Sequence, residues 1–227
     1  MTVVGVAGRS TSRVGLRVGV VGAGILGLAV ARQVQRVLPD ATVTVLEKEQ
    51  RPAAHQSGHN SGVVHAGLYY PPGSLKATLC RRGVALLHEY CLEHGLPYLE
   101  VGKLVVAVSD DELPALERLA ERARANGVPD LARLGPAGIR ELEQEAAGVA
   151  ALHSPRTAIT DFVAVCEQLA RDVIAACGSV RLGFAVDAID PGAFGVTVRT
   201  RAGEQRTFDH LVICAGLQSD RVARLAG

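Results

Sequence analysis

Three closely spaced glycines, Gly22, Gly24 and Gly27, constrain the fold of this chain more than any other feature. The apolar run before them is typical of a β-strand, and the run from Leu28 onward is typical of a helix. In such a strand–turn–helix unit the first glycine suits the tight turn and the second lets the backbone approach a pyrophosphate. The third lets the helix pack closely against the strand. Because the helix N-terminus attracts anions, the pattern predicts a dinucleotide-binding turn.

A carboxylate follows at the spacing that this turn requires. The run Thr42–Leu46 predicts a second strand, and Glu47 comes directly after it, twenty residues beyond Gly27. A carboxylate there accepts hydrogen bonds from the ribose hydroxyls of the adenosine and repels a 2′-phosphate. These residues favour a bound dinucleotide and disfavour NADP, but alone they do not separate NAD from FAD.

The same stretch permits a rival interpretation as a secretory signal peptide. Arg9, Arg13 and Arg17 precede an uncharged run over residues 18–31 that closes on small residues. The run is too short to span a bilayer, which needs about 20 residues. Glu47 argues against this interpretation, because cleavage would leave that carboxylate without a purpose.

The composition is that of an ordinary soluble globular protein, with 48% hydrophobic and 21% charged residues. Lys and Arg (24) balance Asp and Glu (23), so the charge indicates neither a nucleic-acid partner nor an electrostatic membrane anchor. The five cysteines and seven histidines lack metal-ligand spacing, so we expect reduced thiols and no metal site. We expect a cytoplasmic protein, either free or peripheral at the inner face of the membrane. Residues 1–16 lack periodicity and are predicted to be a disordered extension.

A loop rich in polar and small residues follows the second strand, from Lys48 to Val64. Its hydroxyls, amides and glycine N–H groups can wrap a phosphate as a nest does, although such a run can equally be a plain surface loop. The segment His55–Tyr70 resembles the L-2-hydroxyglutarate oxidase/dehydrogenase family, FAD enzymes of the D-amino-acid-oxidase-like superfamily. The likeness returns at residues 72–77, 102–107, 157–162 and 214–221, and so covers nearly everything from Arg17 onward. Thr160 and Phe162 depart mildly from the family pattern.

The resemblance implies an α/β fold, with a Rossmann-like FAD-binding domain and its β-meander interrupted by part of an α+β substrate domain. We expect residues 17–67 and 156–227 to form the FAD-binding domain, incomplete here, and residues 68–155 to form the first part of the substrate-binding domain. Periodicity predicts helices over 74–95, 112–126 and 137–144, a strand over 102–108, and a helix from Asp161 to Gly178. Further strands are predicted over 184–189, 196–199 and 211–214, with turns at 190–192 and 202–203.

The final strand ends in Ala215-Gly216, which is similar to the second fingerprint of this flavoprotein class and favours FAD over NAD. By this likeness Val186 offers backbone groups to the adenine. We expect FAD without a covalent link, although His55, His59 and His65 leave the question of attachment open. The predicted cofactor-binding residues are Gly22, Ala23, Gly24, Ile25, Gly27, Glu47, Lys48, His55, Ser57, Gly58, Asn60, Ser61, Gly62, Val63, Val186, Ala215 and Gly216.

Oxidation of a 2-hydroxy acid moves a hydride from C2 to the flavin while a base accepts the hydroxyl proton. His65 is the candidate base, because an imidazole can accept a proton at neutral pH; packing beside the flavin is the structural alternative. Tyr70 and Lys76 are candidate substrate contacts. Arg81 and Arg82 can also bind a carboxylate, but arginines on an amphipathic helix usually form its solvated face.

The resemblance implies that family members continue for about as much chain again, so we expect these 227 residues to be an inactive N-terminal half, with the other half in a continuing or separate chain. The function expected of the whole is oxidation of L-2-hydroxyglutarate to 2-oxoglutarate, with oxygen or a quinone-linked compound as electron acceptor. Two alternatives stay open. One is a related FAD-dependent amine or amino-acid oxidase, and the other is a non-catalytic fragment.

Overall fold

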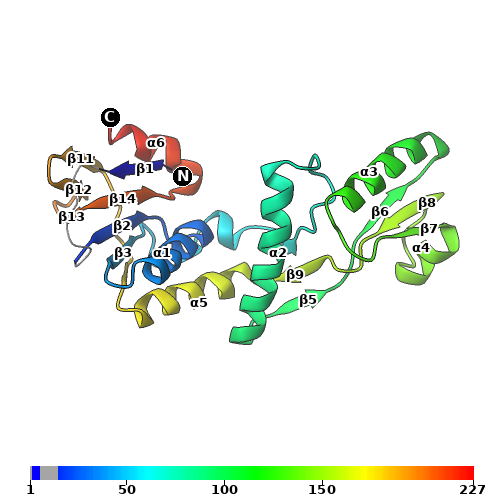
Figure 1. Ribbon diagram of the computed structural model, residues 1–227, viewed down its shortest axis with the longest axis horizontal. Coiled ribbons are helices and arrows are strands. Elements are labelled where there is room, and N and C mark those ends of the chain that lie inside the picture. Colours follow the sequence, from blue (N-terminus) through cyan, green and yellow to red (C-terminus); the bar gives the residue numbers. More distant parts are fainter. Residues whose placement is uncertain (1, 6–14) are drawn as a thin grey trace. The chain divides into compact units, whose positions relative to one another are not determined.

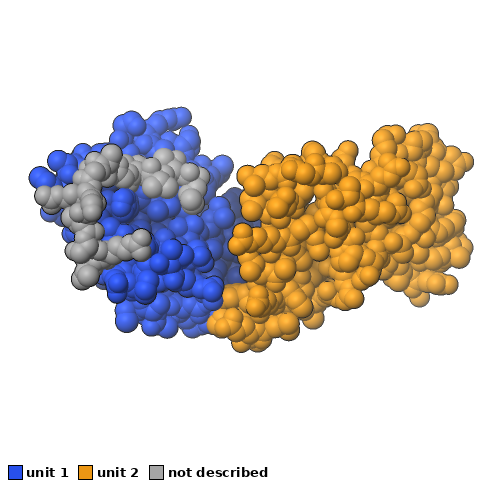
Figure 2. Space-filling model, in the orientation of Figure 1, with its two compact units in different colours: residues 1–60, 162–227 blue, residues 61–161 orange. Residues whose placement is uncertain are grey.

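The computed structural model describes residues 2–5 and 15–227, which form two compact units (Figure 2). Unit 1 comprises residues 1–60 and 162–227, and unit 2 comprises residues 61–161. The units divide at 60/61 and 161/162, whereas the expected domain boundaries are 67/68 and 155/156, and the assignment of the units as FAD-binding and substrate-binding domains stays a prediction. No helix in the described ranges is long and apolar enough to cross a membrane.

A five-stranded sheet organises unit 1, with the strand order β1-β14-β2-β3-β10 (Figure 1). The strands are β1 (Thr2–Gly5), β2 (Arg17–Val21), β3 (Thr42–Leu46), β10 (Ser179–Arg181) and β14 (His210–Ile213). The last four in that order run parallel, and β1 pairs antiparallel with β14. Strands covered on both faces read as continuous apolar runs, which explains the valines of β2 and β3.

Alternate side chains of β2 are buried on opposite faces of the sheet. Val21 belongs to a core shared with the meander of β11 (Ala188–Gly192), β12 (Gly195–Arg199) and β13 (Gln205–Phe208). Val18 and Val20 are also buried, and period-two alternation directs them to the opposite face. The helices α1 (Ile25–Val37) and α5 (Phe162–Ala175) pack against each other, and α1 also contacts β2 and β3. The run over residues 18–31 therefore folds into β2 and α1 and buries most of its apolar side chains, as the dinucleotide-binding interpretation predicts.

Unit 2 combines two three-stranded sheets, ordered β4-β9-β5 and β6-β8-β7, with three helices (Figure 1). The strands are β4 (Val63–Val64), β5 (Tyr98–Glu100), β6 (Leu104–Ala107), β7 (Ala132–Leu134), β8 (Ala150–His153) and β9 (Ala158–Thr160). The helices are α2 (Leu75–His94), α3 (Leu113–Ala125) and α4 (Pro136–Leu142). Leu116 and Ala120 of α3 pack on Leu152 of β8 in the core of this unit.

Short helical segments complete the two units: η1 (Gln56–Gly58), η2 (Asp110–Glu112), η3 (Gly216–Gln218) and α6 (Ser219–Arg224). The predicted helix over 74–95 is confirmed together with both of its ends. The Ser74 hydroxyl accepts from the Ala77 N–H at 3.2 Å, and Gly95 ends the helix in the left-handed conformation. The helices predicted over 112–126, 137–144 and 161–178 are also present, within three residues at each boundary.

Two local predictions require correction. Thr2–Gly5 forms an edge strand on β14 where a disordered extension was expected, because β14 otherwise leaves its backbone groups without a strand partner on that side. Residues 1 and 6–14 of that extension lie outside the described part of the chain. The strand expected over 184–189 starts only at Ala188 and continues through the turn expected at 190–192. Pro191 is compatible with that strand because β11 lies at the edge of its sheet.

Candidate functional site

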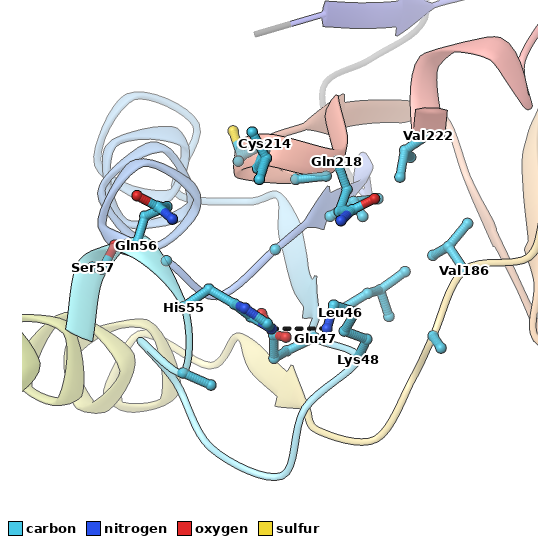
Figure 3. A pocket seen from close by; sticks show the side chains of 18 of the residues that line it. Leu46, Glu47, Lys48, His55, Gln56, Ser57, Val186, Cys214, Gln218 and Val222 are labelled. Carbon is cyan, nitrogen blue, oxygen red and sulfur yellow. Dashed lines mark hydrogen bonds between the residues drawn. The ribbon is translucent and has the colours of Figure 1, made fainter. Parts of the chain in front are cut away.

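The carboxyl ends of β2, β3 and β14 open onto a cleft of about 200 Å³ within unit 1 (Figure 3). Open α/β sheets bind ligands in the crevice outside the carboxyl ends of their parallel strands. Val21, Leu46 and Cys214, which stand at or directly after those ends, all line the cleft. Nine of the predicted cofactor-binding residues also line it: Gly22, Gly24, Glu47, Lys48, His55, Ser57, Val186, Ala215 and Gly216.

The three glycines of the turn are required for three separate reasons. Gly22 has φ +104°, and a Cβ on it would lie 2.4 Å from the Cys214 carbonyl oxygen. A Cβ on Gly27 would lie 1.9 Å from the Gly22 carbonyl oxygen, so the helix packs directly on the turn. A Cβ on Gly24 would meet only the Ser57 hydroxyl, at 3.2 Å, at the wall of the cleft. The fold therefore needs glycine at the first and third positions, whereas at Gly24 the cleft leaves room for a ligand.

Glu47 is held rigidly at the end of β3, with 8% of the residue exposed. One carboxylate oxygen accepts from the Ala23 N–H at 2.8 Å, and the other accepts from the Glu49 N–H at 3.0 Å. A carboxylate offers about four lone-pair sites, so two remain for ribose hydroxyls after these bonds. Ala23 thus contributes to the site by fixing Glu47, although its own side chain does not line the cleft.

The N-terminus of α1 is capped from the polar loop. The Ser57 hydroxyl accepts from the Ile25 N–H at 3.0 Å, while Gly24 at the N-cap position has no side chain to do so. The Asn60 side-chain amide donates to the Ser57 carbonyl at 2.8 Å and so holds the cap in place. A helix N-terminus beside Gly24 and Ser57 is the part of the cleft best suited to a diphosphate.

Ionisable side chains line one part of the cleft, among them Glu47, Lys48 and His55 (Figure 3). The Lys48 ammonium lies 2.8 Å from His55 Nε2, which in turn lies 2.8 Å from a Glu49 carboxylate oxygen. Glu49 also pairs with Lys48, and these hydrogen bonds, first from Lys48 and then from His55, lower the pKa of its carboxyl. Glu49 offsets the positive charge of Lys48, so the part of the cleft lined by Lys48 and His55 is polar without being strongly cationic.

The opposite wall of the cleft is largely apolar (Figure 3). Burial raises the pKa of the Cys214 thiol, so this side chain is neutral at pH 7 and acts as a small apolar group. Val186 and Val222 line the same cleft. Cys214, Val222 and Leu46 were not among the predicted site residues. The end of a predicted strand is the signal that points to Leu46 and Cys214, whereas nothing in the sequence marks Val222.

The other predicted cofactor-binding residues do not line the cleft. Ile25 contributes its N–H to Ser57, and Gly58 is a packing position, because a Cβ there would lie 2.2 Å from the Ala53 carbonyl oxygen. Ser61, Gly62 and Val63 belong to unit 2, where Val63 pairs with Ile159 in β4 and β9. Direct contact of these residues with a cofactor stays a prediction.

In unit 2 the predicted base, His65, is exposed and lines a small cavity of about 10 Å³ together with Tyr70 and Lys103. Lys76 is exposed in the first turn of α2 and does not line this cavity. Arg81 donates to the Ala66 carbonyl at 3.2 Å, so it supports the backbone near His65. No group of three or more His, Cys, Asp or Glu side chains able to hold a metal ion occurs among the described residues.

Comparison with known proteins defines the family. The profile of the DAO family, described as FAD dependent oxidoreductase, matches residues 17–227. The chain belongs to this family. It is 41% identical to the mitochondrial L-2-hydroxyglutarate dehydrogenase of Homo sapiens over 96% of its own length. It is 37% identical to the L-2-hydroxyglutarate dehydrogenase of Escherichia coli (strain K12) over 92%. The chain spans about half the length of these curated relatives, 50% and 49%.

Solved structures agree with this family. The L-α-glycerophosphate oxidase from Mycoplasma pneumoniae with FAD bound matches with a TM-score of 0.81 and 26% identity, over 93% of this chain and 57% of that one. The glycine oxidase from Geobacillus kaustophilus matches with a TM-score of 0.82 and 21% identity, over 92% and 58%, and supports the fold alone. The cofactor of this family member is FAD. The cleft fits it, with room at Gly24, a helix N-terminus for the diphosphate and a fixed carboxylate for the ribose.

Proposed function

We propose that the protein carrying this chain oxidises the 2-hydroxy acid L-2-hydroxyglutarate to 2-oxoglutarate. The observation that carries the proposal is the 41% and 37% identity to proteins named for this substrate, one human and one bacterial, over more than nine-tenths of the chain. The solved structures named for glycerophosphate or glycine are less similar, at 26% and 21% identity. The closer sequence relationship favours the hydroxy acid over an amine.

In this mechanism Glu47 holds the ribose of the FAD, and the N-terminus of α1 beside Gly24 and Ser57 holds its diphosphate. FAD, when bound, supplies an acceptor for the hydride that leaves C2 of the substrate. His65 accepts the proton of the C2 hydroxyl, so the alcohol loses a hydride and a proton and becomes a ketone. Tyr70 and Lys76 remain candidate contacts for the substrate. The eventual electron acceptor is oxygen or a quinone-linked compound.

Substrate comparison in the complete protein, expressed from its own reading frame, tests this function. The flavin spectrum is followed without oxygen while L-2-hydroxyglutarate, glycine, sarcosine or a D-amino acid is added. We expect bleaching of the flavin with L-2-hydroxyglutarate alone. Bleaching by an amine instead would make the protein an amine oxidase, and no bleaching in a flavin-loaded protein would make it non-catalytic. Residues 1–227 expressed alone, which span about half the length of the curated relatives, should bind FAD weakly and turn over no substrate, because a misplacement of about 1 Å can cost ~10²-fold in rate.

We further propose that the FAD is bound without a covalent link, in a cytoplasmic protein. The neighbours of the cleft include His55, but its imidazole is already engaged by Lys48 and Glu49. Acid precipitation of the flavin-loaded protein should release all of the flavin into solution. Yellow colour that stays with the pellet would contradict the non-covalent assignment.

A further inference from the structure

The segment from His65 to Tyr70 in unit 2, termed here the 65–70 loop, is buried in its middle and exposed toward its ends. Ala66 and Leu68 are each 2% exposed and belong to the core beneath α3, whereas His65 and Tyr69 are exposed. Two apolar side chains therefore fix the loop to the core of unit 2, and the His65 imidazole and the Tyr69 phenol lie on its exposed side.

Side chains of α2 hold the first part of this loop. The Cys80 thiol lies 3.0 Å from the His65 carbonyl oxygen and donates to it, and the Arg81 guanidinium donates to the Ala66 carbonyl at 3.2 Å. Burial raises the pKa of the Cys80 thiol, so the thiol keeps its proton at neutral pH and remains a donor.

Side chains at the end of α3 hold the second part. The Asn126 side-chain amide donates to the Gly67 carbonyl at 2.9 Å and to the Tyr70 carbonyl at 2.8 Å. The Arg122 guanidinium donates to the Tyr69 carbonyl at 3.2 Å. Two helices thus fix a stretch that has no regular strand or helix of its own, and a fixed loop can preorganise a binding site.

Lys103 lies over the exposed part of this loop. Its ammonium is 4.8 Å from the centroid of the Tyr69 ring, and it lines the same small cavity as His65. The backbone of Lys103 is fixed by two hydrogen bonds with Ser154, of 3.0 and 2.9 Å. The residue is half-buried, so the backbone from which the ammonium extends toward the ring is held in place.

The ring face of Tyr69 stabilises this cation only in part. A cation–π contact contributes about 0.5–1 kcal/mol at an exposed site. Among the residues that the structure describes, Lys103 forms no ion pair with a carboxylate, and Glu100, the nearest acidic residue in the sequence, pairs with Arg156 instead. An ammonium on a half-buried residue that lines the same cavity as His65, with no ion-pair partner among the described residues, attracts an anionic group from outside the chain.

We propose that Lys103 binds a carboxylate of the hydroxy acid, with Tyr69 as the platform that holds the ammonium in place. This inference rests on the proposed function, since that function supplies a substrate with two carboxylates. It names a substrate contact different from the two candidates Tyr70 and Lys76. It also gives the clamped 65–70 loop a role, because a charge can orient a small acid only if its own position is fixed.

Replacement of Lys103 in the complete, flavin-loaded protein tests the inference by kinetics. Lys103→Met should raise the KM for L-2-hydroxyglutarate about 10–100-fold, the effect of one hydrogen bond to a charged group, with kcat changed much less. Lys103→Arg keeps the charge and should recover most of the loss. Arg118→Met on α3 removes an exposed cation from the same unit and should leave KM unchanged. Melting temperature and flavin spectrum should be those of wild type in all three.

A second substrate distinguishes which carboxylate is bound. L-2-hydroxyvalerate keeps the C1 carboxylate and lacks the distal one. Equal losses with both substrates assign Lys103 to the C1 carboxylate, and a loss confined to L-2-hydroxyglutarate assigns it to the distal one. A KM for Lys103→Met within twofold of wild type on both substrates would overturn the inference.

A chemical readout keeps the inference testable even if L-2-hydroxyglutarate is not oxidised and the proposed function fails. Reductive methylation of lysines, quantified at Lys103 by mass spectrometry, is compared in the presence of glutarate and of the neutral diamide glutaramide. Glutarate should slow modification of Lys103 several-fold more than glutaramide does. Equal rates with the two compounds would overturn the carboxylate site, whatever the enzyme oxidises.

Discussion

In unit 1 the cleft is walled by backbone that emerges from the ends of three parallel strands, whereas in unit 2 the 65–70 loop is held by side chains of two helices. The turn at Gly22, Gly24 and Gly27 can form, and can leave space for a ligand, because these residues have no side chains. The 65–70 loop keeps its conformation because the side chains of Arg122 and Asn126 donate hydrogen bonds to its carbonyl groups. Opposite kinds of substitution should therefore disrupt the two regions. An added carbon atom should impair FAD binding in the cleft, and a removed donor should slow flavin reduction through the loop.

The largest expected effect comes from adding carbon at the cleft. Gly24→Val should abolish FAD binding in the complete protein and leave the fold intact, because its Cβ meets only the Ser57 hydroxyl and the side chain then occupies cleft space left for the diphosphate. Binding is measured by titration of flavin fluorescence, and folding by circular dichroism. An FAD affinity within threefold of wild type would contradict the assignment of this cleft.

A second glycine of the same motif provides the control. Gly27→Ala places a Cβ 1.9 Å from the Gly22 carbonyl oxygen, so backbone must move. Overpacking of this kind costs about 1–3 kcal/mol or more in the free energy of unfolding. We expect Gly27→Ala to lower the melting temperature strongly, whereas Gly24→Val lowers it little. Similar melting temperatures for the two variants would remove the distinction drawn between the glycines.

The next largest effect is expected at the outer side of the 65–70 loop. His65→Ala should reduce the rate of flavin reduction by substrate about 10²–10⁴-fold, the usual contribution of a positioned acid or base. FAD affinity and melting temperature should stay near wild type, because the His65 side chain is exposed and lies outside the core of unit 2. Stopped-flow absorbance without oxygen measures the rate. An unchanged rate would assign the base to another residue.

The contrast between the two regions explains what could be predicted from the sequence. The turn, Glu47 and the end of β14 were predictable because strand ends, glycine spacing and a carboxylate at fixed separation leave a local signature. Ser57 was predicted as a cofactor contact, but its bond to the Ile25 N–H joins residues 32 positions apart and leaves no such signature. Local patterns thus recover the strands and glycines of the cleft but not the cap that completes it.

Long-range side-chain bonds account for most of what was missed in unit 2. Asn126 reaches the 65–70 loop across 56 and 59 positions, and Lys103 meets Tyr69 through a ring contact. An asparagine before Gly127 is also typical of an ordinary helix end, so periodicity marks it as a boundary rather than as a support. Thr2–Gly5 was missed for the same reason, since its partner β14 lies more than 200 residues away.

Removal of one of the side-chain donors that hold the 65–70 loop should have an intermediate effect on the rate of flavin reduction. Asn126→Ala leaves the partly buried Gly67 and Tyr70 carbonyls without that partner, and loss of a hydrogen bond costs about 0.5–1.5 kcal/mol. The loosened loop should slow flavin reduction roughly tenfold and leave FAD affinity unchanged, since the cleft belongs to unit 1. Gln168→Ala removes an amide whose partners, Asp172 and Arg171, lie on α5, and should change neither quantity. A fall in FAD affinity with Asn126→Ala would show that the two regions do not fail independently.

The smallest effect is expected for an ion pair between Arg17 and Asp209, which lies in unit 1 and does not line the cleft. Asp209 accepts from the Arg17 guanidinium at 3.0 Å and from the Arg17 N–H at 2.7 Å, and these bonds lower the pKa of its carboxyl. A lowered folded-state pKa stabilises the protein above the unfolded pKa, and that stability is lost as the pH falls through the folded pKa.

Asp209→Asn should therefore lower the free energy of unfolding by at most about 1 kcal/mol at pH 7, because the pair is partly exposed. In urea titrations the difference from wild type should shrink as the pH falls below about 4, and FAD affinity should not change. A difference that stays constant down to pH 2 would mean that the Asp209 charge is not its source.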